Sequence, residues 1–349
     1  MTAPTTADAL GSPREDLAAG RILDRARDLV APALADAVAT LHPWVAEMAE
    51  YALGRGGTAP GGRGTDAGPR GGKGIRQALA LLGAELAGAP AGTGVPAAVA
   101  VELVHTFSLV HDDIMDGDAL RRGRPALWKA YGTGPAVLAG DALLALAVEI
   151  LSADPAAARR LAGALDDLVR GQADDLLFAR RPWTGPEAVT AREYETMAEH
   201  KTGALLGCAL ALGAHLGGAG DQTVAALDRA GRHLGVAFQI VDDLLGIWGD
   251  PEVTGKPVHG DLREGKKTFP VLAALGGSYG PELAELLGAR DTAERAAGLV
   301  ARAGGRAAAL REARRHLAAA DALLDAVPCS PHAAGDLRSL LSVLTRRTV

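Results

Sequence analysis

The chain has 349 residues, of which 48% are hydrophobic but only 3% aromatic. It is rich in Ala and Leu and has few runs of alternating β-branched residues, which favours a single all-α domain over a fold containing a β-sheet. The formal net charge is -6, and acidic and basic residues are mixed along most of the chain, which argues against a broad nucleic-acid surface.

Residues 1–15 mix Thr, Ala, Pro and Gly without periodicity, so we expect a disordered tail before a helical domain at 16–349. Charged residues interrupt the N-terminus early, and no apolar run approaches the roughly 18 to 20 residues of a membrane span. Neither Cys208 nor Cys329 has metal-ligand spacing, which is typical of thiols in a reducing compartment. These features predict a soluble cytoplasmic protein.

The first part of the domain is predicted to be helical from residue 16 to about residue 53, with breaks at Pro32 and Pro43. Residues 54–72 contain many glycines and no periodic pattern. We expect this segment to form a flexible loop.

The motif G-G-K-G-I-R at residues 71–76 follows this loop and opens a helix that runs to about Leu86. Two glycines before a helix N-terminus bring backbone N–H groups and the cations Lys73 and Arg76 together, as an anion site requires. On these residues alone, a Gly-rich linker with a basic end is an equal alternative.

An apolar helix is predicted from about Pro96 to Met115, and it delivers Asp112, Asp113 and Asp116 at its C-terminal end. Asp112 and Asp116 are four residues apart, so they share one face of a helix. Like charges in this arrangement repel each other, which indicates that a cation lies between them. A metal ion is the expected cation.

Further helices are predicted to begin near Pro135, Pro155 and Pro186, because proline is favoured in the first turn of a helix. Another helix starts near Gln222. Residues 251–267 are polar and turn-rich, and three shorter helical patterns complete the chain. The consistent architecture is an all-α bundle of about a dozen helices.

A second acidic pair, Asp242 and Asp243, lies about 130 residues after the first, with Gln239 before it and Gly246 and Asp250 after it. The neighbouring side chains are apolar, and carboxylates are costly to bury without a partner. The two acidic pairs therefore indicate a shared counter-ion. Carboxylate clusters without His or Cys ligands select hard cations such as Mg²⁺.

Basic side chains occur at the predicted element ends close to these acidic clusters. They are Lys73, Arg76, Arg121, Arg122, Lys201, Lys256, Lys266 and Lys267. Each one alone is typical of a solvated surface, but the set suits a site in which metal and cations hold phosphate oxygens. The chemistry indicated is departure of a diphosphate, with an apolar cavity that protects the resulting carbocation from water.

From about residue 20 onward the chain resembles the isoprenyl diphosphate synthase (polyprenyl synthetase) family. The matching motifs are G-G-K-x-x-R at 71–76, D-D-I-M-D with R-R-G-R-P at 112–125, G-Q-x-x-D at 171–175, K-T-G at 201–203, F-Q-I-V-D-D at 238–243 and G-K-P at 255–257. Six motifs in the family's order are far more specific than any one of them.

The resemblance implies roles for individual residues. Mg²⁺, about three ions per site, would be held by Asp112, Asp116, Asp242 and Asp243. The allylic diphosphate would be bound by Arg121, Lys201, Lys256 and one of Lys266 and Lys267. The diphosphate of isopentenyl diphosphate would be bound by Lys73, Arg76, His105 and Arg122. Gln239 and the backbone at Lys201 and Thr202 would face the developing cation, with Gln172 and Asp175 as support.

His105 has a simpler interpretation as a core histidine, but its seven-residue spacing places it on the Asp112 stripe and favours a functional role. The family fold is an all-α bundle around a deep cavity, usually in a homodimer. Its reaction is ionisation of the allylic diphosphate, attack by the isopentenyl double bond and loss of a proton.

The chain departs from the family pattern at the second acidic motif, where D-D-x-x-D is replaced by D-D-L-L-G with Gly246 in the third position. Asp250 is one candidate replacement, and a carboxylate that acts through water is another. The spacing also resembles, more loosely, the metal motif of class I terpene cyclases. Retention of a second diphosphate site favours condensation over cyclisation, and the largely intact clusters argue against a non-catalytic subunit.

Product length in the family depends on the fifth residue before the first aspartate, which is Phe107 here, whereas helical spacing places Ser108 on the Asp112 stripe. Phe107 resembles the pattern of a geranylgeranyl (C20) synthase, with a farnesyl (C15) synthase as the alternative. A closer resemblance is to bacterial polyprenyl transferases carried inside encapsulin shells, which share D-D-L-L-G-I-W-G-D-P. In those enzymes a disordered N-terminal segment addresses the shell.

Overall fold

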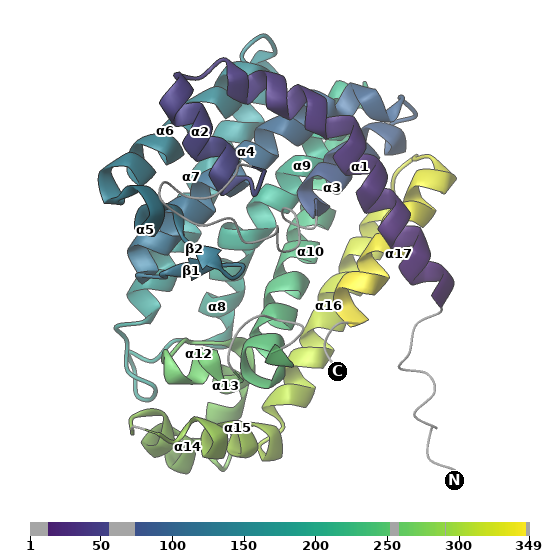
Figure 1. Ribbon diagram of the computed structural model, residues 1–349. Coiled ribbons are helices and arrows are strands. Elements are labelled where there is room, and N and C mark those ends of the chain that lie inside the picture. The colour runs from purple at the N-terminus through teal and green to yellow at the C-terminus, as the bar shows by residue number, and fades with distance from the viewer. Residues whose placement is uncertain (1–12, 56–73, 252–257, 290, 347–349) are drawn as a thin grey trace.

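The computed structural model describes residues 13–55, 74–251, 258–289 and 291–346. Most of the predicted tail and Gly-rich loop lies outside this part of the chain, and so do Lys73 and Lys256. The described residues form a helical bundle with one short β-ribbon, which confirms the predicted all-α class (Figure 1).

The elements of the first half carry both the predicted anion loop and the first acidic cluster. They are α1 (Pro13–Ala39), α2 (Pro43–Ala52), α3 (Ile75–Leu86), the 3-10 turn η2 (Ala91–Gly94), α4 (Val95–Asp116), β1 (Leu120–Arg121), β2 (Arg124–Pro125), α5 (Leu127–Tyr131), α6 (Thr133–Leu151) and α7 (Pro155–Phe178).

The second half begins with a continuous helical segment that contains a π-helical turn. Its elements are α8 (Ala191–Ala198), the π-turn η3 (Glu199–Gly203), α9 (Ala204–Leu216), α10 (Asp221–Trp248), α12 (Gly260–Arg263), α13 (Phe269–Leu275), α14 (Gly280–Leu287), α15 (Ala293–Arg302), α16 (Gly305–Asp325) and α17 (Pro331–Arg346).

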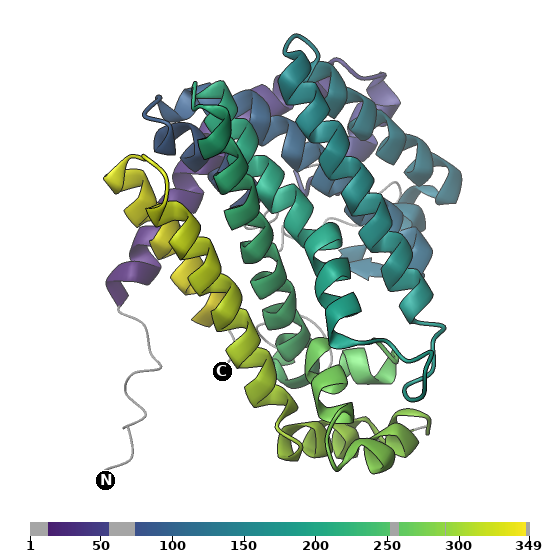
Figure 2. The same ribbon diagram turned by 180° about the vertical axis from the view of Figure 1, so that it is seen from behind.

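The core is built around α9, in which every residue from Ala204 to Ala214 is buried. A helix that is apolar all round must be surrounded by other elements, and α3, α4, α7 and α10 lie against it. Beyond these, α6 packs on α4 and α16 packs on α10, while α17 packs on α1 and α3 (Figures 1 and 2). The helices α3 and α9 approach closely because Gly83 and Gly213 face each other's backbones. This packing holds α4 and α10 on opposite sides of one region.

Several element boundaries differ from the sequence predictions. Pro32 lies inside α1 without ending it. The helix expected near Pro186 begins at Ala191, because Thr190 and Glu193 form a capping box that fixes its start. The C-terminal part contains α13 to α17 in place of three short helices.

Within the described part of the chain, two helices are long and apolar enough to cross a membrane by length and composition, whereas no such run was expected from the sequence. The first, α4 with its preceding turn, has 61% of its most apolar window buried inside the bundle, whereas 39% is buried for α6. The apolar character of α4 is therefore explained by the core. The outer face of α6 needs another explanation.

Candidate active site

The first acidic cluster lies where α4 ends, as predicted. Asp112 is half-buried and Asp116 is exposed on the next turn. Burial raises the pKa of Asp112 to about 6, and the neighbouring Asp116 adds to this increase while Lys201 opposes it. The pKa of Asp116 is also raised by burial, against the effect of Lys201 and Lys266. The charges of Lys201 and Lys266, from other parts of the chain, thus act on the carboxylates at the end of α4.

The two-residue turn between β1 and β2 separates the side chains of Arg121 and Arg122. The strands pair through Arg121 and Arg124, and Arg122 and Gly123 between them have φ of 54° and 74°. Positive φ at both central residues is typical of a type I′ turn, whose twist matches that of a hairpin. Tyr51 fixes this ribbon to α2, because its hydroxyl donates to the Pro125 carbonyl at 2.8 Å.

Arg121 is held against α4 by Asp113, whose role the sequence analysis missed. Its Nε lies 2.7 and 2.8 Å from the two carboxylate oxygens of Asp113, and that carboxylate is only 2% exposed. The charges of Asp112 and Asp118 also act on Arg121. Asp113 therefore positions the guanidinium beside the face of α4 that carries Asp112 and Asp116, while these two carboxylates remain available to other partners.

Arg122 belongs to a different cluster, with Arg76 from α3 and Glu102 and His105 from α4. Burial lowers the pKa of Arg76 to about 10, opposed by Glu102 and reinforced by Arg122. Burial, Arg76 and Arg122 together hold the pKa of His105 well below its usual range, so His105 is neutral. The Arg76 Nε is buried without a hydrogen-bond partner, as expected of a side chain that meets an anionic ligand.

Glu102 is the buried carboxylate that these cations share, and it is 9% exposed. Burial raises its pKa, whereas Arg76, a hydrogen bond from Gln77 and Arg122 lower it. The sequence offered one signal for this residue, because Glu102 is a lone carboxylate within the otherwise apolar run of α4. It offsets part of the repulsion between the two arginines.

The second acidic pair lies on α10 and its two members have different environments. Asp243 is 5% exposed and accepts hydrogen bonds from the Tyr194 hydroxyl at 2.5 Å, the Phe269 amide at 2.9 Å and the Gln239 side chain at 3.2 Å. Burial nevertheless raises its pKa to about 8. Asp242 is exposed on the same helix. Of the predicted pair, Asp242 is the more accessible to a metal ion.

The third position of this motif, Gly246, faces a carboxylate from another element. A Cβ placed on Gly246 would lie 1.9 Å from Oδ2 of Asp261 on α12. Asp261 is 8% exposed, and its charge contributes to the raised pKa of Asp243. The Asp261 carboxylate therefore lies next to position 246, which carries the third aspartate in other members of the family. Asp250 follows α10, which ends at Trp248.

Lys201 and Thr202 lie in the π-turn η3, between α7 and α10. A Cβ on Gly171 of α7 would lie 2.2 Å from the Lys201 amide nitrogen, and a Cβ on Gly235 of α10 would lie 2.2 Å from the Gly203 Cα. Both helices therefore approach η3 through glycine. Because a π-turn interrupts regular i to i-4 bonding, this close packing fixes an irregular backbone at the predicted cation-facing position.

Hydrogen bonds connect η3 to the other predicted residues. Lys201 Nζ donates to the Asp175 carboxylate of α7 at 2.5 Å, and the Thr202 hydroxyl donates to the side-chain amide oxygen of Gln239 at 2.9 Å. Gln172, on the same helix as Asp175, is buried and its Nε2 has no hydrogen-bond partner. Asp175 also raises the pKa of Asp112. The G-Q-x-x-D motif is thus adjacent to the first acidic cluster, as expected.

The two lysines that the sequence could not separate have different surroundings. Lys266 Nζ lies 2.8 Å from Glu264 and 4.0 Å from Asp261, and the charge of Asp116 also raises its pKa. Lys267 is 9% exposed and packs over the Trp183 ring, with Nζ 3.5 Å from the ring centroid. Lys266 is therefore the lysine that lies near the acidic site.

Phe107 and Ser108 lie on α4 in different contacts. The Phe107 ring is 4.8 Å from the His111 ring in an edge-to-face arrangement, and it packs against the main core. The Ser108 hydroxyl donates to the His105 carbonyl at 2.9 Å. The role of either residue in product length stays a prediction.

The residues around the acidic clusters fit magnesium. The candidate ligands Asp112, Asp116 and Asp242 offer carboxylate oxygens only, which is the donor set that hard divalent cations prefer. The raised pKa values of Asp112 and Asp116 mean that their charged forms lack compensation from the protein. A divalent cation supplies that compensation.

Known proteins resemble this chain in sequence and in fold. Residues 66–301 match the family described as Polyprenyl synthetase. The chain is 45% identical to geranylgeranyl diphosphate synthase of Mycobacterium tuberculosis, covering 97% of this chain and 96% of that protein. It is 42% identical to (2E,6E)-farnesyl diphosphate synthase of Mycobacterium bovis, with 93% and 92% covered. A crystal structure of polyprenyl synthetase from Streptomyces coelicolor A3(2) superposes with a TM-score of 0.84 at 42% identity, covering 93% and 98% of the two chains.

Proposed function

Because the chain belongs to the polyprenyl synthetase family and is a prenyltransferase, we propose that it condenses isopentenyl diphosphate with farnesyl diphosphate to give geranylgeranyl diphosphate. One observation carries the proposal of two diphosphate substrates. Of the two adjacent arginines, Arg121 is bound by Asp113 next to Asp112, whereas Arg122 has no such contact among the described residues and its charge acts on Arg76, Glu102 and His105. A cyclase that acts on one diphosphate needs only the first cluster.

In this proposal the first cluster binds the allylic diphosphate through Arg121, Lys201 and Lys266. Bound Mg²⁺ would be held by Asp112, Asp116 and Asp242, where it neutralises the leaving diphosphate. Arg121 is already oriented by its bidentate contact with Asp113, so less side-chain entropy is lost when substrate binds. Lys256 lies outside the described residues and is retained as a further ligand from the family resemblance.

The second cluster binds isopentenyl diphosphate through Arg76, His105 and Arg122, with Lys73 from outside the described residues. Neutral His105 can donate one hydrogen bond to a phosphate oxygen without adding a third positive charge. The buried and unpaired Nε of Arg76 offers another donor. The charge of Glu102 offsets part of the positive charge of the two guanidinium groups in the absence of substrate.

Stabilisation of the developing allylic cation is assigned to the π-turn and to Gln239. Gln239 accepts a hydrogen bond from Thr202 and donates one to Asp243, which fixes the orientation of its amide. The backbone carbonyls of η3 follow the π-turn pattern, in which the Glu199 carbonyl accepts from the Ala204 amide, rather than the α-helical one. Fixed dipoles of this kind stabilise positive charge without reorganisation.

Direct assay tests the proposed reaction. Purified protein with Mg²⁺, isopentenyl diphosphate and farnesyl diphosphate is expected to yield geranylgeranyl diphosphate, identified by chromatography of the dephosphorylated product. A cyclic hydrocarbon formed from the allylic substrate alone would contradict condensation. Absence of any product from the isolated chain would instead indicate a subunit that needs a catalytic partner.

Phe107 is proposed to limit product length to C20. Phe107→Ala removes a large side chain from α4 and is expected to shift the main product to chains longer than C20 while preserving turnover. Product chromatography measures this shift, with Ser108→Ala as the matched control on the same helix. If Phe107→Ala still gives only the C20 product, another residue limits chain growth.

We further propose that the protein is a homodimer that uses the exposed face of α6. Val137 and Val148 are 40% and 43% exposed and lie eleven residues apart, about three turns, on one stripe of this helix. Val137→Lys combined with Val148→Lys is expected to give monomers in light scattering, because charges at an interface core are poorly tolerated. Leu17→Lys, at an exposed position on α1, should leave the dimer intact.

The proposed location is the cytoplasm. Encapsulation is tested separately, because the predicted address segment at residues 1–15 lies largely outside the described residues. Co-expression with an encapsulin shell should enclose the full chain and not a variant that lacks these residues. If neither the full chain nor the truncated variant enters the shell, the protein is not encapsulin cargo.

A further inference from the structure

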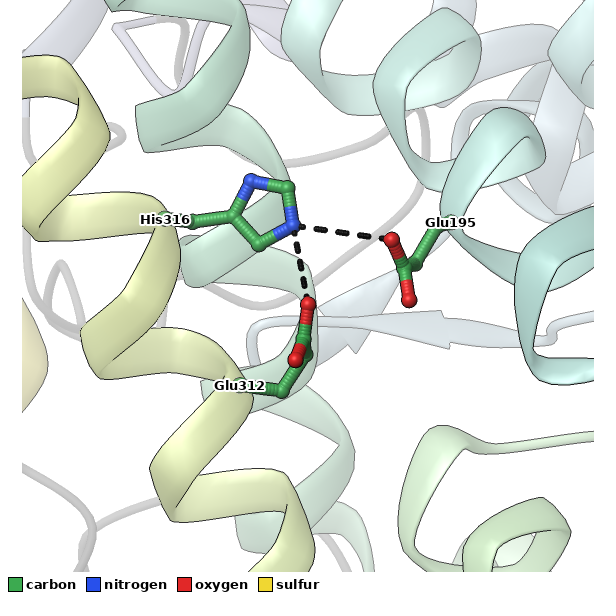
Figure 3. Close-up of side chains that lie close together, drawn as sticks. All are labelled: Glu195, Glu312 and His316. Carbon is green, nitrogen blue, oxygen red and sulfur yellow. Dashed lines mark ion pairs between the residues drawn. The ribbon is translucent and has the colours of Figure 1, made fainter.

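One histidine and two carboxylates meet on the side of the bundle that faces away from the candidate active site. Glu195 lies on α8, and Glu312 and His316 lie one turn apart on α16 (Figure 3). His233 of α10 lies behind them. His233 precedes Asp242 by nine residues, which is two and a half helical turns, so His233 and Asp242 lie on opposite sides of α10. This cluster is therefore distinct from the aspartates assigned to Mg²⁺.

The distances within the cluster approach those of a metal site. His316 Nε2 lies 3.4 Å from Glu312 Oε1 and 3.8 Å from Glu195 Oε2. In a tetrahedral Zn²⁺ site with bonds of about 2.0–2.1 Å, ligand atoms are about 3.3–3.4 Å apart. All three ligand atoms lie within 4.8 Å of one another, so a modest shortening, including that of the contact between His316 and Glu195, would bring them to these distances.

The protonation of His316 suits metal binding. Its Nδ1 lies 2.9 Å from Nδ1 of His233, and its Nε2 lies 3.0 Å from Arg315 Nη2. Arginine only donates, so Nε2 is an acceptor, and Nδ1 carries the proton that is donated to His233. Burial lowers the pKa of His316 to about 4, with Arg315 adding to this effect. A neutral imidazole, oriented by a hydrogen bond at its other nitrogen, is the usual metal-ligating form.

The guanidinium group of Arg315 lies between the three ligand atoms. Its Nη2 lies 3.1 Å from Glu195 Oε2, pairs with Glu312 and contacts His316 Nε2. One positively charged nitrogen thus contacts all three ligand atoms. The Arg315 side chain is 55% exposed, so it can turn outward into solvent when a metal ion takes over its pairing with the two carboxylates.

We propose that Glu195, Glu312 and His316 form a second metal site, which binds Zn²⁺ with one water molecule after Arg315 swings outward. Imidazole combined with carboxylates suits Zn²⁺ rather than Mg²⁺, and the 30% exposure of the Glu195 side chain leaves access for the water. The bound ion links α8 to α16. Since α8 continues directly into η3, the link restrains the element that carries Lys201.

Zn²⁺ uptake by the full-length protein tests the proposal, with Mg²⁺ in large excess to occupy the active-site aspartates. Equilibrium dialysis is expected to find one Zn²⁺ per chain. His316→Gln should lower the affinity at least tenfold, whereas Arg315→Gln should raise it because a competing cation is removed. His332→Gln is the matched control, since His332 pairs with Asp336 one turn away but has an 88% exposed side chain.

Thermal unfolding provides a second measurement. Zn²⁺ should raise the Tm of the wild type and of Arg315→Gln, and not that of His316→Gln, because a ligand of the native state stabilises it. Prenyltransferase activity with Mg²⁺ checks that His316→Gln is folded. The proposal is overturned if His316→Gln retains the same Zn²⁺ affinity as the wild type and the His332→Gln control, or if neither the wild type nor Arg315→Gln takes up Zn²⁺.

Discussion

Asp112→Ala is expected to lower kcat by about 10³-fold or more, with a much smaller change in the Tm. A carboxylate that holds a catalytic metal contributes several kcal/mol to stabilising transition-state charge, and each 1.36 kcal/mol is about tenfold in rate. The fold should tolerate the change, because burial and Asp116 disfavour the ionised form of Asp112. Steady-state kinetics over a range of Mg²⁺ concentrations measures the loss.

Asp118→Ala is the matched control, because Asp118 is exposed two residues beyond Asp116 and outside the motif. In the wild type the Mg²⁺ requirement should also rise as the pH falls. The raised pKa of about 6 means that Asp112 loses its charge as the pH drops through that value, so protons compete with metal. Near-normal turnover of Asp112→Ala would refute the metal assignment.

Gly246→Asp is expected to inactivate the enzyme, although it restores the family pattern D-D-x-x-D. The new Cβ would lie 1.9 Å from Asp261 Oδ2, and a second carboxylate cannot occupy the same volume. Overpacking of this kind costs about 1–3 kcal/mol before repulsion is counted. Displacement of α12 would also move Lys266, which follows Asp261 closely in the chain. We expect kcat/KM to fall at least about 10²-fold, in line with about 2.7 kcal/mol.

The double variant Gly246→Asp with Asp261→Gly provides the decisive comparison. If Asp261 supplies the carboxylate that position 246 lacks, the double variant should recover activity relative to either single variant, which a double-mutant cycle quantifies. Asp261→Gly alone should lose activity. A fully active Gly246→Asp protein would show that Asp261 and position 246 do not share this space.

The predictions that succeeded rest on local signals. The helix ending at Asp116 and the start of α3 at Ile75 follow from apolar periodicity and from glycine, which act over a few residues. Periodicity also showed that Asp112 and Asp116 share a face. The placement of α4 and α10 on either side of one region had no local signal, so its prediction depended on the chemical need of two acidic pairs for one cation and on the family resemblance.

The details of the site that stayed incomplete depend on contacts distant in sequence. Asp261 follows Gly246 by fifteen residues across a turn-rich segment, and no periodic pattern connects them. The difference between Asp242 and Asp243 arises from Tyr194 and Phe269, which lie on other helices. Sequence periodicity shows which residues share a face, but it does not show which donors face them from elsewhere.

The π-turn at Glu199–Gly203 has a consequence for the register of the chain. Each hydrogen-bonded ring of a π-turn contains one residue more than that of an α-helix, and one residue corresponds to a rotation of about 100°. The side chains of α8 are therefore rotated about the helix axis relative to those of α9, although the two helices are continuous. Deleting a single residue here would remove this rotation and turn the buried Tyr194 and Met197 away from their partners. The length of this segment, and not only its composition, is thus constrained by the site.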